Sequence, residues 1–327
     1  MPNQNDLNAT KMKTVCSALA FVLFSLLNTL VKNNIIFKYV FPTNEVLEMC
    51  RMVVTVLVLW MAQCARLVRL PPLDTCLWHR FFPLQYIFVG IKATDLGGIH
   101  GINFSGFIAI SRLNILMTMI FEKIILGVQA SCAVKASVIA MVGGALISTA
   151  DEDNDVVTSS CTGIICLLLN NVFIAAILVN YKRIIDSKDV GVYGLLFYDA
   201  LFMILPALIV AGCTVNLYGF AVAMFWLDSV FWVHLMISCL LGMLLSYSMI
   251  LCTQYNSALT SSIIESLKNI LVAYMALEVQ YMVSWLNFVG LLIGLIGGLV
   301  YVCIAFMRIS VPANLMLKES KNNLTSI

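Results

Sequence analysis

Long apolar runs recur through most of the chain, and they constrain its fold more than any other feature. They lie between Thr14 and Phe306, and a helix needs about 20 such residues to cross the hydrocarbon core of a bilayer. Of the 327 residues, 61% are hydrophobic and only 11% are charged, which excludes an ordinary soluble domain and most disordered chains. The sequence therefore predicts an all-α membrane protein that crosses the bilayer many times.

Ten spans are predicted, joined by loops too short to hold a soluble domain. The first run follows Lys11 and Lys13 without a small-residue cleavage pattern, so we interpret it as a retained span rather than a signal peptide. The predicted spans are 14–35, 45–64, 80–99, 103–124, 131–150, 160–181, 193–213, 230–250, 257–278 and 283–307.

The distribution of basic residues predicts the orientation. With both termini in the cytosol, the far side holds only Lys32 and Lys38, together with an acidic run at 151–155. Basic loop residues mark the cytosolic side of a membrane protein, which supports ten spans and two cytosolic termini. The cytosolic side then holds Lys11, Lys13, Arg66, Arg69, Arg80, Lys123, Lys182, Arg183, Lys188, Arg308, Lys318 and Lys321.

The acidic run falls near the middle of the chain and separates five predicted spans from five. An odd number of spans in each half makes the two halves inverted in the membrane, and transporters often place their site between such repeats. The predicted division is a cytosolic tail (1–13), a first five-helix repeat (14–150), an acidic lumenal loop (151–159), a second five-helix repeat (160–307) and a cytosolic tail (308–327).

One predicted span, within the stretch from Leu251 to Tyr274, carries charges at its centre. Glu265, Lys268 and Asn269 lie there, although a charged residue at bilayer depth costs about 3 kcal/mol or more. Glu265 and Lys268 are three residues apart and share a helix face, so they can pair. The pair could fix helix packing or form part of a substrate site. Nearby hydroxyls come from Ser261, Ser262 and Ser266.

A second intramembrane cation lies at a comparable place in the other half. Arg112 falls in the fourth span, as Lys268 falls in the ninth. An anionic ligand between the halves would meet both cations. Arginine grips phosphate oxygens with two parallel hydrogen bonds, and lysine acts as a compact charge.

Other charges in the spans form two pairs with three-residue spacing, Glu48 with Arg51 and Lys92 with Asp95. We interpret both pairs as neutralised structural bridges or as groups at the water interface.

Motifs of catalysis are missing from the sequence. It holds no HExxH, GxSxG or P-loop pattern, its three histidines are scattered, and its eleven cysteines match no zinc or redox spacing. We therefore predict no catalytic site, no metal site and no cofactor. The absence of a basic stripe also argues against nucleic acid as a partner. The sequence leaves the oligomeric state open, a homodimer included.

An aromatic stretch opens the seventh span and ends in a carboxylate. Such aromatics usually anchor a span at the interface, but Tyr198 could also stack on a base and use its hydroxyl as a hydrogen-bond donor. Asp199 follows directly and would be costly against lipid. A nucleotide-facing role is therefore plausible for both residues.

At these residues the chain resembles the nucleotide-sugar transporters of the drug/metabolite transporter superfamily, and it is most similar to their UDP-sugar branch. The resemblance covers most of the chain and is densest in three segments: 186–207, 251–274 and 287–301. It implies ten spans in the Golgi or endoplasmic-reticulum membrane. It also implies exchange of a cytosolic UDP-sugar for lumenal UMP.

The resemblance extends to two motifs, each with a departure. A Phe-Tyr-Asn-Asn motif that contacts the nucleotide in GDP-mannose transporters falls on 197–200, where Asp199 and Ala200 replace the asparagines. UDP-sugar members tend towards Gly-x-x-Lys-Asn in the ninth span, where Lys268 and Asn269 agree and Glu265 replaces glycine.

Two other functions compatible with the same fold remain open. One is transport of another organic anion or metabolite, which would keep the charges without selectivity for a base. The other is a non-transporting scaffold or regulator descended from a transporter, which would tolerate Asp199 and Glu265 most easily. Tyr198, Asp199, Arg112, Glu265, Ser266, Lys268 and Asn269 are the predicted substrate-binding residues.

Overall fold

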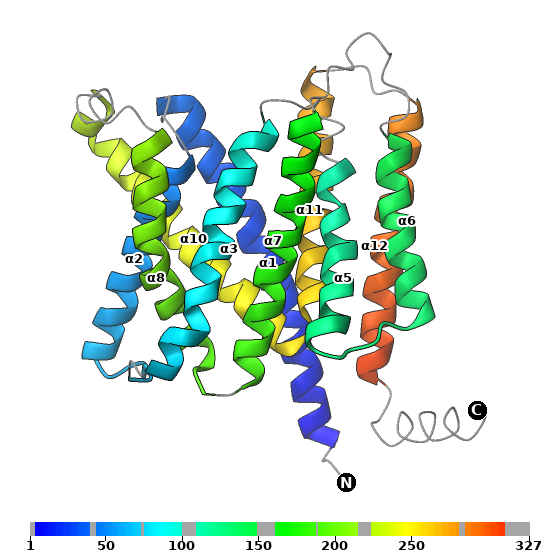
Figure 1. Cartoon of the computed structure of the whole chain (residues 1–327), viewed down its shortest axis with the longest axis horizontal. Coiled ribbons are helices and arrows are strands. Elements are labelled where there is room, and N and C mark those ends of the chain that lie inside the picture. The colour runs from blue at the N-terminus through cyan, green and yellow to red at the C-terminus, as the bar shows by residue number, and fades with distance from the viewer. Residues whose placement is uncertain are drawn as a thin grey trace.

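The computed structural model describes residues 4–39, 44–72, 75–99, 109–148, 161–187, 189–214, 224–280 and 285–310. Within these ranges the regular structure is helical, and no β-strand occurs. Figure 1 shows the helices standing side by side in one bundle, with the start of the chain at its lower end. The predicted lumenal loop and most of the predicted C-terminal tail lie outside the described residues.

Ten long helices account for most of the described chain, together with the short 3₁₀ helix η2 (Met224–Leu227). They are α1 (Gln4–Tyr39), α2 (Asn44–Cys64), α3 (Thr75–Ile99), α5 (Leu113–Ile125), α6 (Cys132–Ser148), α7 (Cys161–Asp186), α8 (Gly191–Thr214), α10 (Ser229–Tyr255), α11 (Ala258–Gln280) and α12 (Trp285–Ser310).

The helices agree with the predicted spans except at two starts. Helix α1 begins at Gln4 rather than near residue 14, because its polar first turns continue the helix beyond the bundle (Figure 1). Helix α5 begins at Leu113 rather than near residue 103, and residues 100–108 lie outside the described ranges. Five helices in the described ranges are long and apolar enough to cross a membrane: α1, α7, α8, α10 and α12.

The pairs of helices that pack together are repeated between the two halves of the chain. Replacing each helix by the one five places along the helix order converts the pair α1–α10 into α7–α3, and both pairs pack extensively. The same replacement converts α2–α10 into α8–α3 and α1–α11 into α7–α5, and these pairs are in contact too. It leaves unchanged the pairs α2–α8, α5–α11 and α6–α12. The principal contacts therefore join one half of the chain to the other.

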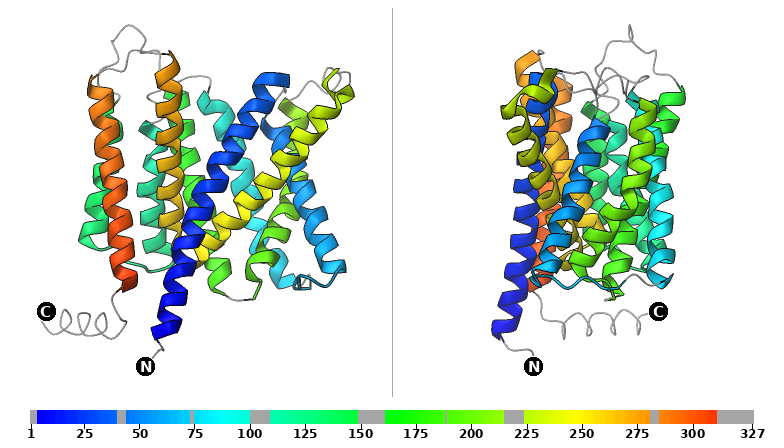
Figure 2. Two further views of the ribbon diagram at one scale, coloured as in Figure 1. Left: turned by 180° about the vertical axis from the view of Figure 1, so that it is seen from behind. Right: turned by 90° about the vertical axis from the view of Figure 1, so that its left-hand side faces the viewer.

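Helices α6 and α12 approach each other more closely than side chains would allow. A Cβ atom added at Gly290 would clash with the backbone of Ser148 and with the carbonyl of Gly144. Small residues at such a seam let two membrane helices pack backbone to backbone. These helices form one edge of the bundle in Figure 1 and in the left view of Figure 2.

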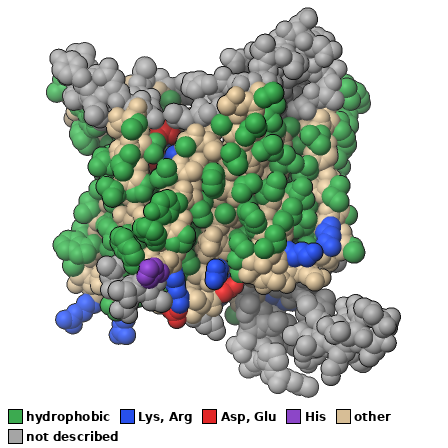
Figure 3. Space-filling view, viewed as in Figure 1, with side chains coloured by type: hydrophobic (Ala, Val, Ile, Leu, Met, Phe, Trp, Pro, Cys, Tyr) green, Lys and Arg blue, Asp and Glu red, His purple; other side chains and the backbone are tan. Residues whose placement is uncertain are grey.

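The surface divides into an apolar band and a charged lower edge. Figure 3 shows hydrophobic side chains over most of the visible face and basic side chains gathered along its lower edge. Helix α1 begins at this lower end and α12 finishes there (Figure 2). A few charged side chains are visible in a hollow higher on the same face (Figure 3).

Candidate functional site

The helix that leads into α5 is broken at Arg112. Residues 109–111 are helical, Arg112 is a turn, and α5 begins at the next residue. The backbone N–H of Arg112 donates to the carbonyl of Ala109 at 3.2 Å, and that of Ile115 donates to the carbonyl of Arg112 at 3.2 Å. Both bonds span three residues instead of the four of an α-helix. The break places Arg112 inside the bundle.

The Arg112 guanidinium is buried without a partner. The residue is 3% exposed, and among the described residues neither terminal nitrogen finds a hydrogen-bond acceptor. A buried charge is costly unless it is paired and hydrogen-bonded. The terminal nitrogens of Arg112 therefore offer four N–H donors to an anion that the described chain does not supply.

Two polar contacts between α5 and α11 show that these helices run antiparallel. Near the lower end, the Glu122 carboxylate accepts from the backbone N–H of Leu259 at 2.9 Å. Further up, the hydroxyls of Thr118 and Ser262 lie 3.5 Å apart. Arg112 lies six residues before Thr118 of α5, and Lys268 lies six residues after Ser262 of α11. Since both helices advance about 1.5 Å per residue, Arg112 and Lys268 lie at the same level.

The predicted ion pair between Glu265 and Lys268 is present. The Lys268 side chain is 13% exposed and the Glu265 side chain 41% exposed. Ser266 beside them is buried, whereas Asn269 is exposed. The pair thus lies within a helix of the bundle, with its carboxylate on the more open side.

The course of α10 explains why Glu265 is open. Four residues earlier on the same face of α11, the hydroxyl of Ser261 lies 2.9 Å from that of Thr253 on α10. Above this contact α10 runs diagonally away from α11 (Figures 1 and 2). Glu265 therefore lies on the part of α11 from which α10 has diverged.

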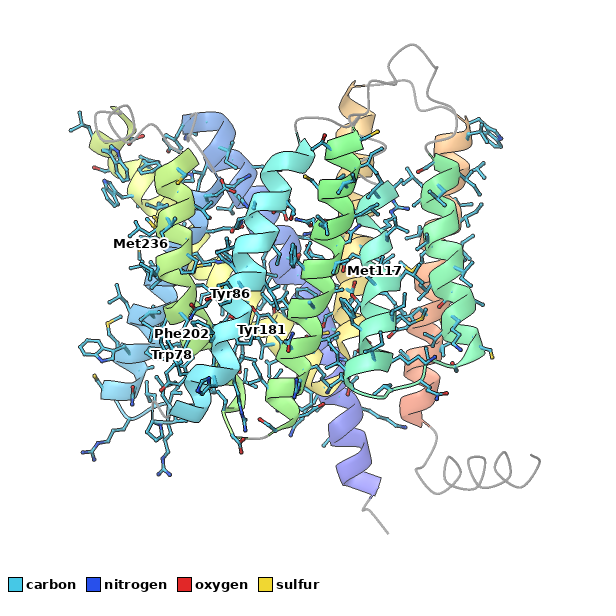
Figure 4. The ribbon with its side chains drawn as sticks, viewed as in Figure 1. Trp78, Tyr86, Met117, Tyr181, Phe202 and Met236 are labelled. Carbon is cyan, nitrogen blue, oxygen red and sulfur yellow. The ribbon has the colours of Figure 1, made fainter. Side chains whose placement is uncertain are left out.

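The side chains of Tyr198 and Asp199 are engaged elsewhere in the protein. Tyr198 on α8 donates its hydroxyl to the Pro71 carbonyl and packs against Phe202, at a ring-centroid distance of 6.0 Å. Asp199 accepts from the hydroxyl of Tyr181 on α7 at 2.9 Å, in the lower half of the bundle (Figure 4). The described contacts do not bring these two residues together with the cations of α5 and α11.

Neither pair expected within a helix is an ion pair in the described part of the chain, where Lys92 and Glu48 instead pair between helices. Lys92 on α3 forms an ion pair with Glu48 on α2, and the Glu48 carboxylate also lies 3.7 Å from the Lys32 ammonium on α1. Glu45 adds a second carboxylate 4.0 Å from Lys92. We call these four residues, Lys32, Glu45, Glu48 and Lys92, the α1–α3 charge cluster.

The remaining members of the predicted pairs contact other helices. The side chain of Arg51 packs where a Cβ atom of Gly242 on α10 would lie, so α10 needs glycine there. Asp95 accepts at 2.7 Å from the side-chain amide of Asn170 on α7. Three-residue spacing allowed pairing within a helix, but Lys92 forms its ion pair with Glu48 of α2 and Asp95 bonds to Asn170 of α7.

Two buried polar groups were missed by reasoning from sequence. Glu122 accepts from the N-terminal turn of α11, and Asn171 donates to a backbone carbonyl before Arg112. The signal for Asn171 was present, because Asn170 and Asn171 interrupt an otherwise apolar run. In the described part of the chain, no group of three or more His, Cys, Asp or Glu residues could hold a metal ion.

Comparison with known proteins gives consistent relatives. No protein-family model matches the chain. It is 38% identical over 307 residues to UDP-sugar transporter UST74c of Drosophila melanogaster, covering 93% of this chain and 81% of that one. It is 36% identical over 297 residues to UDP-sugar transporter sqv-7 of Caenorhabditis elegans, covering 89% of each. Nucleotide sugar transporter SLC35D2 of Homo sapiens is 34% identical over 294 residues, with 89% of this chain and 86% of that one covered.

A solved crystal structure shares the fold. It superposes with a TM-score of 0.62 over 91% of this chain and 98% of its own, at 13% sequence identity. At that identity the likeness concerns the fold alone.

Proposed function

Because this chain belongs to the nucleotide-sugar transporter family, we propose that it exchanges a cytosolic UDP-sugar for lumenal UMP across the Golgi or endoplasmic-reticulum membrane. The relatives carry the names of UDP-sugar and nucleotide sugar transporters. They are transporters and not enzymes, which confirms the prediction that this chain is not an enzyme.

The observation that carries the proposal is that the terminal nitrogens of Arg112 are buried without a hydrogen-bond partner among the described residues. A nucleotide sugar and a nucleoside monophosphate share a phosphate group, which an arginine fork can bind with two charge-assisted hydrogen bonds. Lys268, level with it on α11, supplies a second cation to the same anion. Ser266 and Asn269 flank Lys268 and are proposed as polar contacts to the ligand.

Glu265 gives a reason for exchange rather than one-way transport. In the empty carrier Glu265 neutralises Lys268, and a bound phosphate competes with the carboxylate for the same cation. A ligand then has to displace the internal partner, and its departure restores the pair. Because both residues lie within one turn of α11, the pair adjusts the charge of the empty site and does not tie two helices together.

The nucleoside is proposed to lie towards α8, near Tyr198 and Asp199. In the described arrangement both side chains have partners within the protein, Pro71 and Tyr181. A nucleoside would therefore exchange its own contacts for these bonds. The aromatic ring of Tyr198 is buried in this arrangement, and once uncovered it could stack on uracil whatever the sugar.

The proposed membrane arrangement is ten spans in two inverted five-helix repeats, 14–150 and 160–307. The exchange of packing partners between the halves supports it, because a twofold axis relating the repeats would produce that pattern. Both termini are proposed to be cytosolic, and the acidic loop 151–159 lumenal. The gathering of basic side chains at the end where α1 begins supports this orientation (Figure 3).

The deciding experiment is uptake into proteoliposomes that contain the purified protein and are preloaded with UMP. A panel of UDP-sugars and GDP-sugars is added outside, and empty liposomes and vesicles without UMP serve as controls. We expect uptake of one or more UDP-sugars that requires internal UMP. Uptake of none of the panel, or uptake independent of the trapped nucleotide, would contradict the proposal.

Multi-angle light scattering of the same purified protein tests whether it forms a homodimer.

A further inference from the structure

The buried side chain of Asn171 holds the backbone at the break before α5. Its amide nitrogen donates at 2.6 Å to the carbonyl oxygen of Ile110, and the residue is 2% exposed. Ile110 precedes Arg112 by two residues. In an unbroken helix the Ile110 carbonyl would accept from the N–H of Asn114, four residues on.

The bonds around Arg112 show why this carbonyl needs an outside donor. The N–H groups of Arg112 and Ile115 both bond three residues back, so the helix is tightened at Arg112. A carbonyl left without its helical partner in a buried place is costly, and a side-chain amide can replace that partner. Asn171, from the second half of the chain, satisfies a backbone group in the first.

The neighbouring residue fixes the other side of α7. The amide of Asn170 donates to the Ile91 carbonyl at 3.1 Å and to the Asp95 carboxylate at 2.7 Å, both on α3. The two adjacent asparagines therefore bind different helices. Asn170 faces the charge-bearing helix α3, and Asn171 faces the segment that carries Arg112.

We propose that Asn171 is a positioning residue for Arg112: it stabilises the broken backbone that aims the guanidinium at the anion. This inference rests on the proposed function, in which Arg112 binds a phosphate. Without the amide, the Ile110 carbonyl can regain its own helix N–H, and the segment before α5 straightens. The direction in which Arg112 leaves the helix then changes, and one of its two hydrogen bonds to the phosphate is lost.

The test compares UMP affinity of purified full-length variants by titration calorimetry. Asn171→Leu removes the hydrogen-bond donor while keeping the side chain nearly the same size. Asn171→Ser keeps a polar but shorter side chain and is used if the leucine variant does not fold. Asn180→Leu is the matched control, because Asn180 lies on the same helix and its side-chain amide donates within that helix, to the Ala176 carbonyl at 2.8 Å. We expect Asn171→Leu to weaken UMP binding about tenfold, the loss of one charge-assisted hydrogen bond, and Asn180→Leu to leave it unchanged.

The specific readout is a double-mutant cycle with Arg112→Lys. Lysine binds phosphate as a point charge and has no fork to aim, so Asn171→Leu should have no further effect on affinity in that background. A merely structural Asn171 would weaken binding equally in both backgrounds, and that result would overturn the inference.

The remaining outcomes separate this inference from the proposed function. Normal UMP binding by both Arg112→Lys and Arg112→Ala would contradict the phosphate site itself. Weakened binding by the Arg112 variants together with normal binding by Asn171→Leu would overturn only the role of Asn171. Failure of both Asn171 variants to fold would assign the residue to the fold and would overturn the inference as well.

Discussion

The α1–α3 charge cluster and the α5–α11 site, which consists of Arg112, Glu265 and Lys268, both place cations inside the bundle, but the two regions neutralise these cations differently. In the cluster, Lys32 and Lys92 share the carboxylate of Glu48, and Lys92 has Glu45 as a second partner. At the site, Lys268 has one partly exposed partner, and Arg112 has none among the described residues.

From this difference we propose that the charges of the cluster serve the fold and that Arg112 and Lys268 serve a ligand. When two buried charges form an ion pair, neither charge is available to bind a substrate. Removing one member leaves the other buried without a partner. An unpaired buried cation lowers the stability of the empty protein and is neutralised when an anion binds. The two regions should therefore respond oppositely to the removal of charge.

The largest expected effect comes from neutralising one cation in each region. Lys92→Met leaves Glu48 and Glu45 with a buried partner missing, so we expect a loss of about 3–5 kcal/mol in stability. Arg112→Met removes an unpaired charge, so the protein without ligand should melt at the same or a higher temperature, yet uptake should be lost. Melting curves with and without UMP measure the stability of both variants, and UDP-sugar uptake into UMP-loaded proteoliposomes measures transport. A marked fall in the melting temperature of Arg112→Met would remove the contrast.

The next effect concerns the second cation of the site. Lys268→Ala should abolish UMP binding and UDP-sugar exchange, because the phosphate then meets only Arg112. The fold should survive, since the partner left behind, Glu265, is 41% exposed and can be hydrated. Exchange is measured in UMP-loaded proteoliposomes. A Lys268→Ala protein that exchanges at the normal rate would exclude this lysine from the site.

Tyr198 tests whether the site extends from α11 towards α8. If its ring stacks on uracil, Tyr198→Ala should weaken competition by UMP about tenfold or more, the loss of roughly 1–3 kcal/mol of stacking. Asp199→Asn is the milder companion, because asparagine can still accept from the Tyr181 hydroxyl, and its transport should be near normal. Unchanged UMP competition by a folded Tyr198→Ala protein would confine the site to α5 and α11.

The smallest expected effect is a gain in affinity. Glu265→Gly removes the carboxylate that competes with phosphate for Lys268, so UMP should bind several-fold more tightly and raise the melting temperature further. If the pair were only a static bridge, the variant would bind UMP no better and would be less stable. Titration calorimetry and melting curves with UMP distinguish the two.

Much of the architecture could be predicted from the sequence because it depends on local properties. Apolar runs of sufficient length predicted helices close to those found, and only the starts of α1 and α5 differ by many residues. The Glu265–Lys268 pair could be predicted for the same reason, since residues three apart on a helix meet whatever surrounds them.

Contacts between helices could be decided only by the tertiary structure. Whether Lys92 meets Asp95 or Glu48 depends on how α2 and α3 are rotated about their axes, which local spacing does not contain. The same holds for Tyr198 and Asp199, whose partners come from a loop and from α7.

By itself, the sequence indicated a helical membrane protein that resembles a transporter family and has a basic residue at a comparable place in each half. The tertiary structure decided that Lys268 has a partner and that Arg112 has none among the described residues. It also brought Asn171 from the other half of the chain to the break beside Arg112. The physical reason is that burial and hydrogen bonding of a side chain are set by the packing of several helices, whereas its position along one helix is set by the chain alone.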